Sequence, residues 1–235
     1  MNLILLFQDD FIDNTIVRLQ DRRLKHVLEV HRASVGDELC VGVLNGQIGF
    51  GKVKLLTPSV LEMEVRLERQ PPAALPLTLI LALPRPKVLR RVLRSVSSLG
   101  VKKIILLNCF RVEKSFWQSP FLSESSVNEQ LILGLEQGRD TILPEVLFRP
   151  LFKPFVEDEV PALIKGTRCL VAHPTATAPC PRDVKRAVTL AIGPEGGFIL
   201  YEIEKLVACG FTPVQMGERI LNVETAVPAL IARLF

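Results

Sequence analysis

The stretch AIGPEGGF, residues 191–198, decides the fold of the second half of the chain. The apolar run VTLAI, residues 188–192, leads into a turn that holds three glycines, and a helical pattern follows it. A strand, a glycine-rich turn and a helix in this order are typical of a nucleotide phosphate site. Glu195 lies inside the turn, however, and the Lys and Ser/Thr of a phosphate loop are missing. The turn therefore predicts an α/β sheet whose ligand is not a simple phosphate.

Strands alternate with helices on both sides of this turn. One helix is predicted at residues 86–98, where an apolar stripe and a basic stripe share the helical period. Other helices are predicted at residues 123–138, directly after the turn, and after Asn222. Apolar runs predict strands at residues 77–83, 102–108, 169–173, 188–192 and 212–216. The alternation predicts an α/β class with a mostly parallel sheet.

The N-terminal part has a different pattern. Short alternating runs at residues 3–7, 37–43, 48–56 and 60–68 are separated by turn signals such as Asn45-Gly46. They predict a small β-barrel or meander, interrupted by one helix at about residues 18–32. The uncharged, proline-rich sequence QPPAALP, residues 70–76, is expected to separate the two patterns.

Composition limits the function classes. The chain has 235 residues, 48% of them hydrophobic, which is enough for one large or two modest cores. Five widely spaced cysteines without a C-x-x-C pair indicate free thiols in a reducing, cytoplasmic compartment. Three histidines make a metal centre unexpected, and no apolar run has transmembrane length. We therefore expect no metal and no membrane partner.

Positive charge is concentrated in one segment. Residues 85–114 carry nine Lys/Arg and one acid, Glu113, although the whole chain has a net charge of only +4. Such a segment is repulsive unless a polyanion or nearby acids offset it. Two explanations stay open, a nucleic-acid surface or a solvated basic face packed near the slightly acidic C-terminal part.

Three turns follow short strands in the C-terminal half, at residues 172–174, 192–197 and 215–221. Ligands of open α/β sheets bind at the carboxyl ends of the strands, so these turns are expected to meet at one site. Their glycines would let the backbone approach a ligand closely. Because Glu195 favours a cationic ligand, a sulfonium cofactor fits the turn better than ATP, and ordinary tight turns are the alternative.

The sequences of these turns resemble a known family. LAIGPEGGFILYEIEKL (residues 190–206) and QMGERILNVETAVPALI (residues 215–231) are similar to the two C-terminal signatures of RsmE-type small-subunit rRNA methyltransferases, in the SPOUT superfamily. Further similar segments are HVLEVHRASVGDEL (26–39), SSLGVKKIILLNCFRVEKS (97–115), LEQGRDTILPEV (135–146) and VAHP (171–174). The resemblance thus extends over most of the chain.

The resemblance implies the organisation and the reaction. A PUA-like β-barrel that binds RNA is expected at residues 1–70, a linker at 71–76, and a SPOUT domain with a C-terminal trefoil knot at 77–235. The implied cofactor is S-adenosylmethionine, and the implied reaction is methylation of N3 of a uridine in 16S rRNA of the small ribosomal subunit. A homodimer with the cofactor at its interface is implied as well.

The same resemblance implies site residues. The cofactor is expected to contact Ala172, His173, Ile192, Gly193, Gly196, Gly197, Met216, Gly217, Ile220 and Leu221. Arg219 and Glu224 are the candidates for substrate orientation or proton handling; the alternatives are an intradomain salt bridge for Arg219 and a helix N-terminal carboxylate for Glu224. RNA contacts are expected from Arg22, Arg23, Lys25, His26, Arg32, Arg85, Lys87, Arg91, Arg111 and Lys114. Phe116 and Trp117 lie next to this patch, where core packing or base stacking is expected.

Several positions depart from the family pattern. Asn222 replaces the last Arg of Arg-Ile-Leu-Arg, Ser98 and Asp140 replace a Glu and an Arg, and Ile199 replaces a helix-capping Ser. The cofactor turns are nearly intact, while these changes fall mainly on the substrate side. A SPOUT methyltransferase with another RNA substrate, or a non-catalytic RNA-binding or ribosome-assembly factor, are therefore alternatives to the uridine-N3 enzyme.

Overall fold

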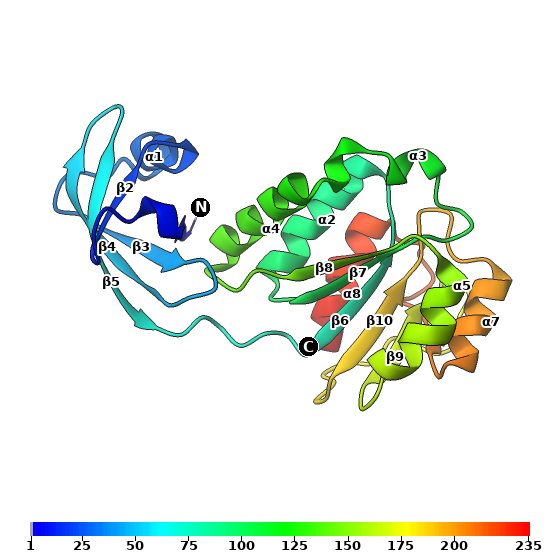
Figure 1. The fold of residues 1–235 in the computed structure, drawn as a ribbon. Coiled ribbons are helices and arrows are strands. Elements are labelled where there is room, and N and C mark those ends of the chain that lie inside the picture. The colour runs from blue at the N-terminus through cyan, green and yellow to red at the C-terminus, as the bar shows by residue number, and fades with distance from the viewer. Residues whose placement is uncertain (1) are drawn as a thin grey trace. The chain divides into compact units, whose positions relative to one another are not determined.

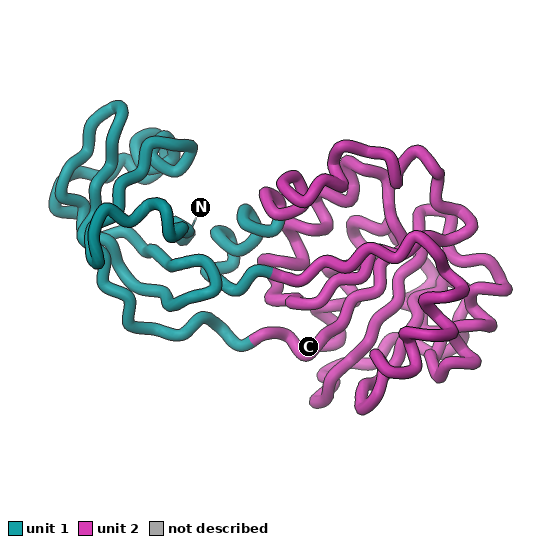
Figure 2. The backbone as a smooth tube through the Cα atoms, viewed as in Figure 1, with its two compact units in different colours: residues 1–73, 131–143 teal, residues 74–130, 144–235 magenta. Residues whose placement is uncertain are grey.

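The chain forms two compact units in a computed structural model that describes residues 2–235. Unit 1 contains residues 1–73 and 131–143, and unit 2 contains residues 74–130 and 144–235 (Figure 2). Residues 131–143 belong to unit 1 although they lie within the predicted range 77–235. The helix α4 (Glu124–Gly138) therefore begins in unit 2 and ends in unit 1.

Unit 1 is built on a mixed five-stranded sheet (Figure 1). The strands are β1 (Ile4–Leu6), β2 (Ile16–Leu19), β3 (Glu38–Val43), β4 (Ile48–Leu56) and β5 (Leu61–Arg69), in the order β1-β3-β4-β5-β2. Only β1 and β3 pair in parallel. Alternate side chains such as Leu61, Met63 and Val65 point into the core with η1 (Gln8–Asp10) and α1 (Arg22–His26) nearby. The predicted small β unit is confirmed as a sheet.

The helix predicted at residues 18–32 is wrong at its beginning. Ile16–Leu19 is a strand that pairs antiparallel with β5. The helix begins only after Asp21, whose carboxylate accepts a hydrogen bond from the Arg23 amide at 2.8 Å and caps α1. After α1 the chain continues as η2 (Val27–His31), a π-helical turn that ends at Arg32 in the left-handed conformation.

Arg23 holds the sheet of unit 1 together from inside. Its side chain is 4% exposed and donates to both carboxylates of Asp10 and Asp21 at 2.6–3.0 Å. It also donates to the Leu5 carbonyl at 2.7 Å and lies over the Phe7 ring. Every donor direction of the guanidinium is occupied, so we withdraw Arg23 from the residues expected to contact RNA.

Unit 2 contains a six-stranded sheet in which every pair is parallel. Its strands are β6 (Leu77–Ala82), β7 (Lys103–Leu107), β8 (Glu145–Arg149), β9 (Arg168–Ala172), β10 (Val188–Ile192) and β11 (Thr212–Val214), in the order β11-β9-β10-β6-β7-β8. The predicted α/β class and its parallel sheet are confirmed. The sequence patterns did not predict β8, because it is a partly exposed edge strand that lacks a continuous apolar run.

Helices cover both faces of this sheet (Figure 1). On one face α2 (Pro86–Ser98) packs against α8 (Val223–Leu234). On the other face α7 (Leu200–Ala208) lies beside η4 (Phe155–Glu159), to which Lys205 and Glu157 link it by an ion pair of 2.6 Å. The remaining helices are α3 (Lys114–Trp117), η3 (Pro120–Leu122), α5 (Phe152–Pro154) and α6 (Val160–Leu163). Within residues 2–235, no helix is long and apolar enough to cross a membrane.

Replacing Arg23 with Met should loosen unit 1, because two carboxylates would lose their common partner. Removing one partner of a buried ion pair costs about 3–5 kcal/mol. We expect amides of β1 to exchange hydrogen for deuterium at least about a hundredfold faster, measured by mass spectrometry. The matched control is Arg18→Met, which breaks an ion pair of 2.7 Å between partly exposed side chains and should cost at most ~1 kcal/mol. Equal exchange in the two variants would contradict the central role of Arg23.

Candidate functional site

Three parallel strands of unit 2 end at the same level. Ala172 of β9 is paired in register with Ile192 of β10 and with Val214 of β11. Ile192 is in turn level with Leu81 of β6. The turns that follow β9, β10 and β11 therefore leave one edge of the sheet side by side, as predicted from the order of strands and turns.

The turn after β10 is tight because its glycines allow it. The Gly197 amide donates to the Pro194 carbonyl at 2.7 Å, and Gly197 has φ +73°, a conformation that side chains disfavour. At Gly193, a Cβ atom would lie 2.9 Å from the Phe198 amide nitrogen, so the backbone folds back onto itself there. Around Gly197, by contrast, a Cβ atom would have no neighbour within 4 Å. One side of the turn is thus packed and the other is open.

Glu195 fastens this turn to the beginning of α2. Its carboxylate accepts a hydrogen bond of 3.0 Å from the amide of Arg85, the residue that precedes α2. A carboxylate at a helix N-terminus is stabilised by the helix dipole. Arg85 was predicted to contact RNA; its backbone holds Glu195, while its side chain is exposed.

Arg111 holds the turn from a second direction. Its guanidinium donates to the Gly196 carbonyl, and its Cδ would lie 3.0 Å from a Cβ atom at Gly196. Arg111 was predicted to contact RNA, and the structure places it against the turn that was predicted to bind the cofactor. The absence of a side chain at Gly196 is what lets the arginine lie there.

Glu202 is a buried carboxylate behind the same turn. It is 2% exposed and accepts hydrogen bonds from the Ile199 amide at 2.9 Å and the Phe110 amide at 2.7 Å. The first bond is the half of the capping box that remains after Ile replaced Ser at residue 199. Burial, with the charge of Glu202 as a second cause, raises the pKa of the Cys109 thiol, which stays neutral. Sequence reasoning missed the bond to Phe110, since 92 residues separate the two.

The turns after β9 and β11 bind each other through the backbone. The His173 amide donates to the Val214 carbonyl at 2.9 Å, and the Cys180 amide donates to the Gln215 carbonyl at 2.8 Å. The Gln215 amide donates to Ala178 at 2.9 Å. Arg233 of α8 reaches the same loop and donates to the Cys180 carbonyl at 2.7 Å. Residues 173–187 are thereby held against residue 215 and the end of the chain.

The two candidate catalytic residues differ in their surroundings. Arg219 is exposed, and no residue in the described range 2–235 forms a hydrogen bond or ion pair with its side chain. Glu224, in the first turn of α8, forms an ion pair of 2.7 Å with Arg91 of α2. Arg91 was predicted to contact RNA; its side chain is 60% exposed and also neutralises Glu224. Between them, Ile220 is 81% exposed.

Asn222 is the N-cap of α8. Its side-chain oxygen accepts a hydrogen bond of 2.8 Å from the Thr225 amide. An asparagine is among the best residues for this position, whereas an arginine cannot accept such a bond. The departure from the family pattern at residue 222 therefore exchanges a cation for a helix cap.

Several residues of the predicted basic surface bind other residues of their own unit. In unit 2, Arg90 lies over the Phe121 ring and Arg94 donates to Gln130 at 2.8 Å. Trp117 is half-buried and donates to Asn108 at 2.9 Å, so it is fixed to the end of β7. In unit 1, the two terminal nitrogens of the Arg22 guanidinium donate to the two carboxylate oxygens of Glu136 at 2.8 and 2.9 Å. The predicted RNA contacts with exposed side chains are Arg22, Lys25, Arg32, Arg85, Lys87, Arg91, Arg111 and Lys114.

Two cavities lie away from the three turns. One, of about 200 Å³, is in unit 1 between the beginning of β1 and Arg139. The other, of about 510 Å³, lies in unit 2 between β7, β8 and residues 155–163. No turn residue lines either cavity. In the described part of the chain, no group of three His, Cys, Asp or Glu side chains is arranged to hold a metal ion.

Comparison with known proteins identifies the family of the chain. A family model described as an RNA methyltransferase domain matches residues 71–235. Ribosomal RNA small subunit methyltransferase E of Treponema pallidum is 32% identical over 241 residues, which cover 99% of this chain and 90% of that protein. The chain belongs to the ribosomal RNA small subunit methyltransferase E family.

Other members of the methyltransferase E family match over similar lengths. Methyltransferase E 1 of Borreliella burgdorferi is 23% identical, with 96% of this chain and 94% of that protein covered. A crystal structure of the Neisseria gonorrhoeae methyltransferase E bound to S-adenosylmethionine superposes with a TM-score of 0.73. That match covers 98% of this chain and 95% of the other at 21% identity, and it shows that the fold is shared.

The N-cap at residue 222 can be tested separately from any activity. Asn222→Ala should lower the free energy of unfolding of unit 2 by about 1 kcal/mol, because the Thr225 amide loses its acceptor. Asn222→Asp should keep the stability within a few tenths of a kcal/mol, since the carboxylate also caps. Urea unfolding followed by fluorescence of Trp117, the only tryptophan, would measure both. Equal stability of the alanine and aspartate variants would show that the cap contributes nothing.

Proposed function

We propose that this protein uses S-adenosylmethionine to methylate N3 of a uridine in 16S rRNA of the small ribosomal subunit. The observation that carries the proposal is the common end of β9, β10 and β11, from which the three turns with the family signatures leave together. Membership of the methyltransferase E family supports rRNA of the small subunit as the substrate. The cofactor is supported by the Neisseria relative, which binds it on the same fold.

The three turns fit a cofactor that is held mainly by backbone groups. We assign the cofactor contacts to Ala172, His173, Ile192, Gly193, Gly196, Gly197, Met216, Gly217, Ile220 and Leu221. Gly217 has φ +130° and, like Gly197, has open space where a Cβ atom would point. Glu195 is not placed on the sulfonium, because its carboxylate is bound to the N-terminus of α2. Its role is to fix the turn.

The chemistry requires positioning and control of one proton. The cofactor supplies an activated methyl group, which a uridine nitrogen displaces in line, so alignment of the two reactants provides most of the rate. The N3 proton must leave, and the anion that forms needs a positive charge nearby. Arg219 suits this role, because its guanidinium has no partner in the described chain. Glu224 is paired with Arg91 at 2.7 Å and orients that arginine.

The detailed architecture proposed for the chain follows the family. We assign residues 1–70 to a PUA-like RNA-binding barrel, 71–76 to a linker and 77–235 to a SPOUT domain with a trefoil knot. The knot is supported by α7 and α8, which lie on opposite faces of the sheet. Residues 215–222 must therefore pass the strand ends beside residues 173–187, which Gln215 and Arg233 hold.

A homodimer with the cofactor at its interface belongs to the same proposal. Ile220 is 81% exposed although it lies in a turn assigned to the cofactor. A second copy or the cofactor would cover it. RNA contacts are assigned to Arg22, Lys25, His26, Arg32, Arg85, Lys87, Arg91, Arg111 and Lys114, with phosphates as the main partners.

The proposal is tested by cofactor binding and by mapping of the modified base. Calorimetry should show S-adenosylmethionine binding below millimolar concentration, and its absence would favour a non-catalytic RNA-binding factor. Deletion of the gene should remove N3-methyluridine from 16S rRNA. If the 16S modification persists while the cofactor binds, the enzyme acts on a different RNA.

The hydrogen bond between the Glu195 carboxylate and the Arg85 amide, at the N-terminus of α2, should contribute to cofactor affinity. Glu195→Ala removes the acceptor of the Arg85 amide, and we expect the Kd for S-adenosylmethionine to rise about tenfold, the equivalent of one net hydrogen bond. Glu195→Gln keeps an acceptor oxygen and should stay within threefold of the wild type. The control is Glu204→Ala, which removes an exposed carboxylate from α7. Equal loss in the Gln and Ala variants would mean that charge, not the hydrogen bond, matters.

A further inference from the structure

The most exposed large apolar side chains lie at the edge of the sheet that carries the three turns. Among residues 2–235 they are Ile220, Phe110 and Leu200, with exposed fractions of 81%, 78% and 73%. Ile220 belongs to the turn after β11, and Leu200 begins α7, after the turn that follows β10. Phe110 comes three residues after Leu107, the end of β7. β7 and β10 end at the same edge of the sheet, because both pair in parallel with β6.

The backbone of Phe110 is fixed although its ring is exposed. The two carboxylate oxygens of Glu202 accept hydrogen bonds from the Phe110 amide at 2.7 Å and from the Ile199 amide at 2.9 Å. The next residue, Arg111, donates to the Gly196 carbonyl and lies along the turn after β10. The ring therefore projects from a backbone that is held against this turn. A group presented in this way loses little further conformational entropy when it binds a ligand.

Phe110 is the exposed aromatic residue of the basic segment. Phe116 and Trp117, for which base stacking was one of the two expectations, are both half-buried. Trp117 is also fixed by its hydrogen bond of 2.9 Å to Asn108. The structure thus moves the candidate for base stacking from Trp117 to Phe110, nearer to the three turns.

The charges around Phe110 are mainly positive. The exposed cations of the segment are Arg85, Lys87, Arg91, Arg111 and Lys114. The exposed acids of the segment and of the turn after β10 are Glu113 and Glu195, and Glu195 already accepts the Arg85 amide. Single-stranded nucleic acids are bound by surfaces of this kind, where a base stacks on an aromatic ring and cations meet the phosphates.

We propose that the Phe110 ring stacks on one unpaired base of the RNA substrate, at the edge of the site that we assign to the cofactor. The inference rests on the proposed function and adds a residue that positions the RNA. Every base has a π-face, so this contact holds the chain in place without reading its sequence. Leu200 extends the apolar surface, since Glu202 holds its neighbour Ile199 together with Phe110. A second copy of the chain is the competing partner, but covering the ring with protein would not call for the cations around it.

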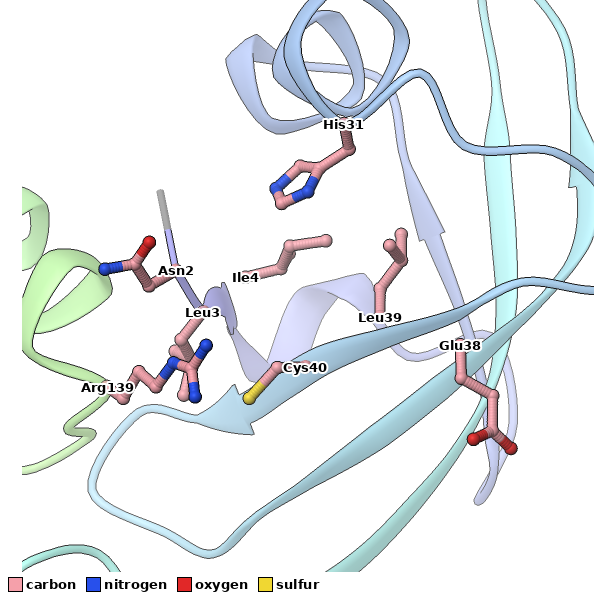
Figure 3. Close-up of a pocket in the computed structure, with 8 residues that line it drawn as sticks. All are labelled: Asn2, Leu3, Ile4, His31, Glu38, Leu39, Cys40 and Arg139. Carbon is pink, nitrogen blue, oxygen red and sulfur yellow. The ribbon is translucent and has the colours of Figure 1, made fainter.

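The cavity of unit 1 does not offer a comparable site (Figure 3). Its volume is about 200 Å³, and the basic side chains in its lining are His31 and Arg139. Ile4 and Leu39 belong to one core cluster and Leu3 to another, so the walls of this cavity belong to two faces of the sheet. Its two basic groups therefore do not meet around one ligand.

Ring signals in the NMR spectrum of the full chain provide a direct test. The chain has twelve phenylalanines, and the ring signal that disappears in Phe110→Leu is that of Phe110. The probes are a short single-stranded oligoadenylate and polyphosphate, which carries charge but no bases. We expect the Phe110 ring signal to move upfield with oligoadenylate and to stay in place with polyphosphate. An unchanged signal with both probes, or equal shifts with both, would overturn the proposal.

Binding of the RNA substrate provides the second test. The probe is the small ribosomal subunit purified from a strain that lacks the gene, and co-sedimentation measures its Kd. Phe110→Ala should raise the Kd about five- to a hundredfold, the usual effect of losing one stacked base. Phe110→Tyr keeps the flat ring and should bind as the wild type does, whereas Phe110→Leu keeps an apolar side chain without a ring and should bind nearly as weakly as Phe110→Ala. Wild-type affinity in the Ala or the Leu variant would overturn the proposal.

Controls separate stacking from folding and from association of two copies. Because the ring is largely exposed, Phe110→Ala should unfold at the wild-type temperature and should keep the Kd for S-adenosylmethionine, since Glu202 binds the amide of residue 110 and not its ring. Val207→Ala removes an exposed apolar side chain near the end of α7 and should bind subunits as the wild type does. Analytical ultracentrifugation should show the same oligomeric state for Phe110→Ala and the wild type. A change of that state would mean that a second copy covers the ring, and would overturn the proposal.

These tests are independent of methyl transfer. A chain that shows the ring shift with oligoadenylate but does not bind S-adenosylmethionine would contradict the proposed reaction and leave the stacking contact standing. A chain that methylates 16S rRNA, and whose Phe110→Ala variant binds subunits as tightly as the wild type, would contradict the stacking contact alone.

Discussion

The common register of β9, β10 and β11 is the constraint on which the site depends. Parallel pairing makes Ala172, Ile192 and Val214 end together, so three turns from distant parts of the sequence become neighbours. No single turn encloses a ligand by itself. A one-residue slip of β10 would move Ile192 away from Ala172 and reverse which side chains face the helices. The five buried residues of β10 oppose such a slip, because both faces of this strand are covered.

The turn after β10 is then fixed by groups that come from elsewhere in unit 2. Glu195 binds the beginning of α2, Arg111 binds Gly196, and Glu202 binds the amides of Ile199 and Phe110. Two of these partners follow β7, and one precedes α2. The strand ends of β6 and β7 thus support the turn that belongs to β10. A binding site held by such bonds is preorganised, which lowers the entropy lost when a ligand binds.

The sequence predicted the strands of unit 2 well because buried parallel strands are continuous apolar runs. The same apolar runs predicted that the three turns lie side by side, because each turn follows a strand and the strands end at one edge of the sheet. It did not reveal the partner of any charged side chain. Arg23 and Arg32 look alike in the sequence, yet one is buried between two aspartates and the other is exposed. That difference depends on Asp10, which only the folded sheet brings next to Arg23. The bond from Glu195 to Arg85 spans 110 residues and has no local signal either.

Asparagine and arginine at residue 222 would have different effects on the stability of α8 and on the charge of the turn before it. An arginine there would bring a cation to the side that we propose for the substrate, but it would leave the Thr225 amide without its acceptor. With asparagine, α8 begins with a good cap, and Glu224 and Arg91 neutralise each other one turn away. In the proposed reaction at uridine N3, the positive charge that the anion needs would then come from another residue of the same turn. Arg219, three residues earlier, exposed and without a partner in the described chain, is placed to provide it. In the mechanism that we propose, asparagine at residue 222 therefore makes methyl transfer depend more strongly on Arg219.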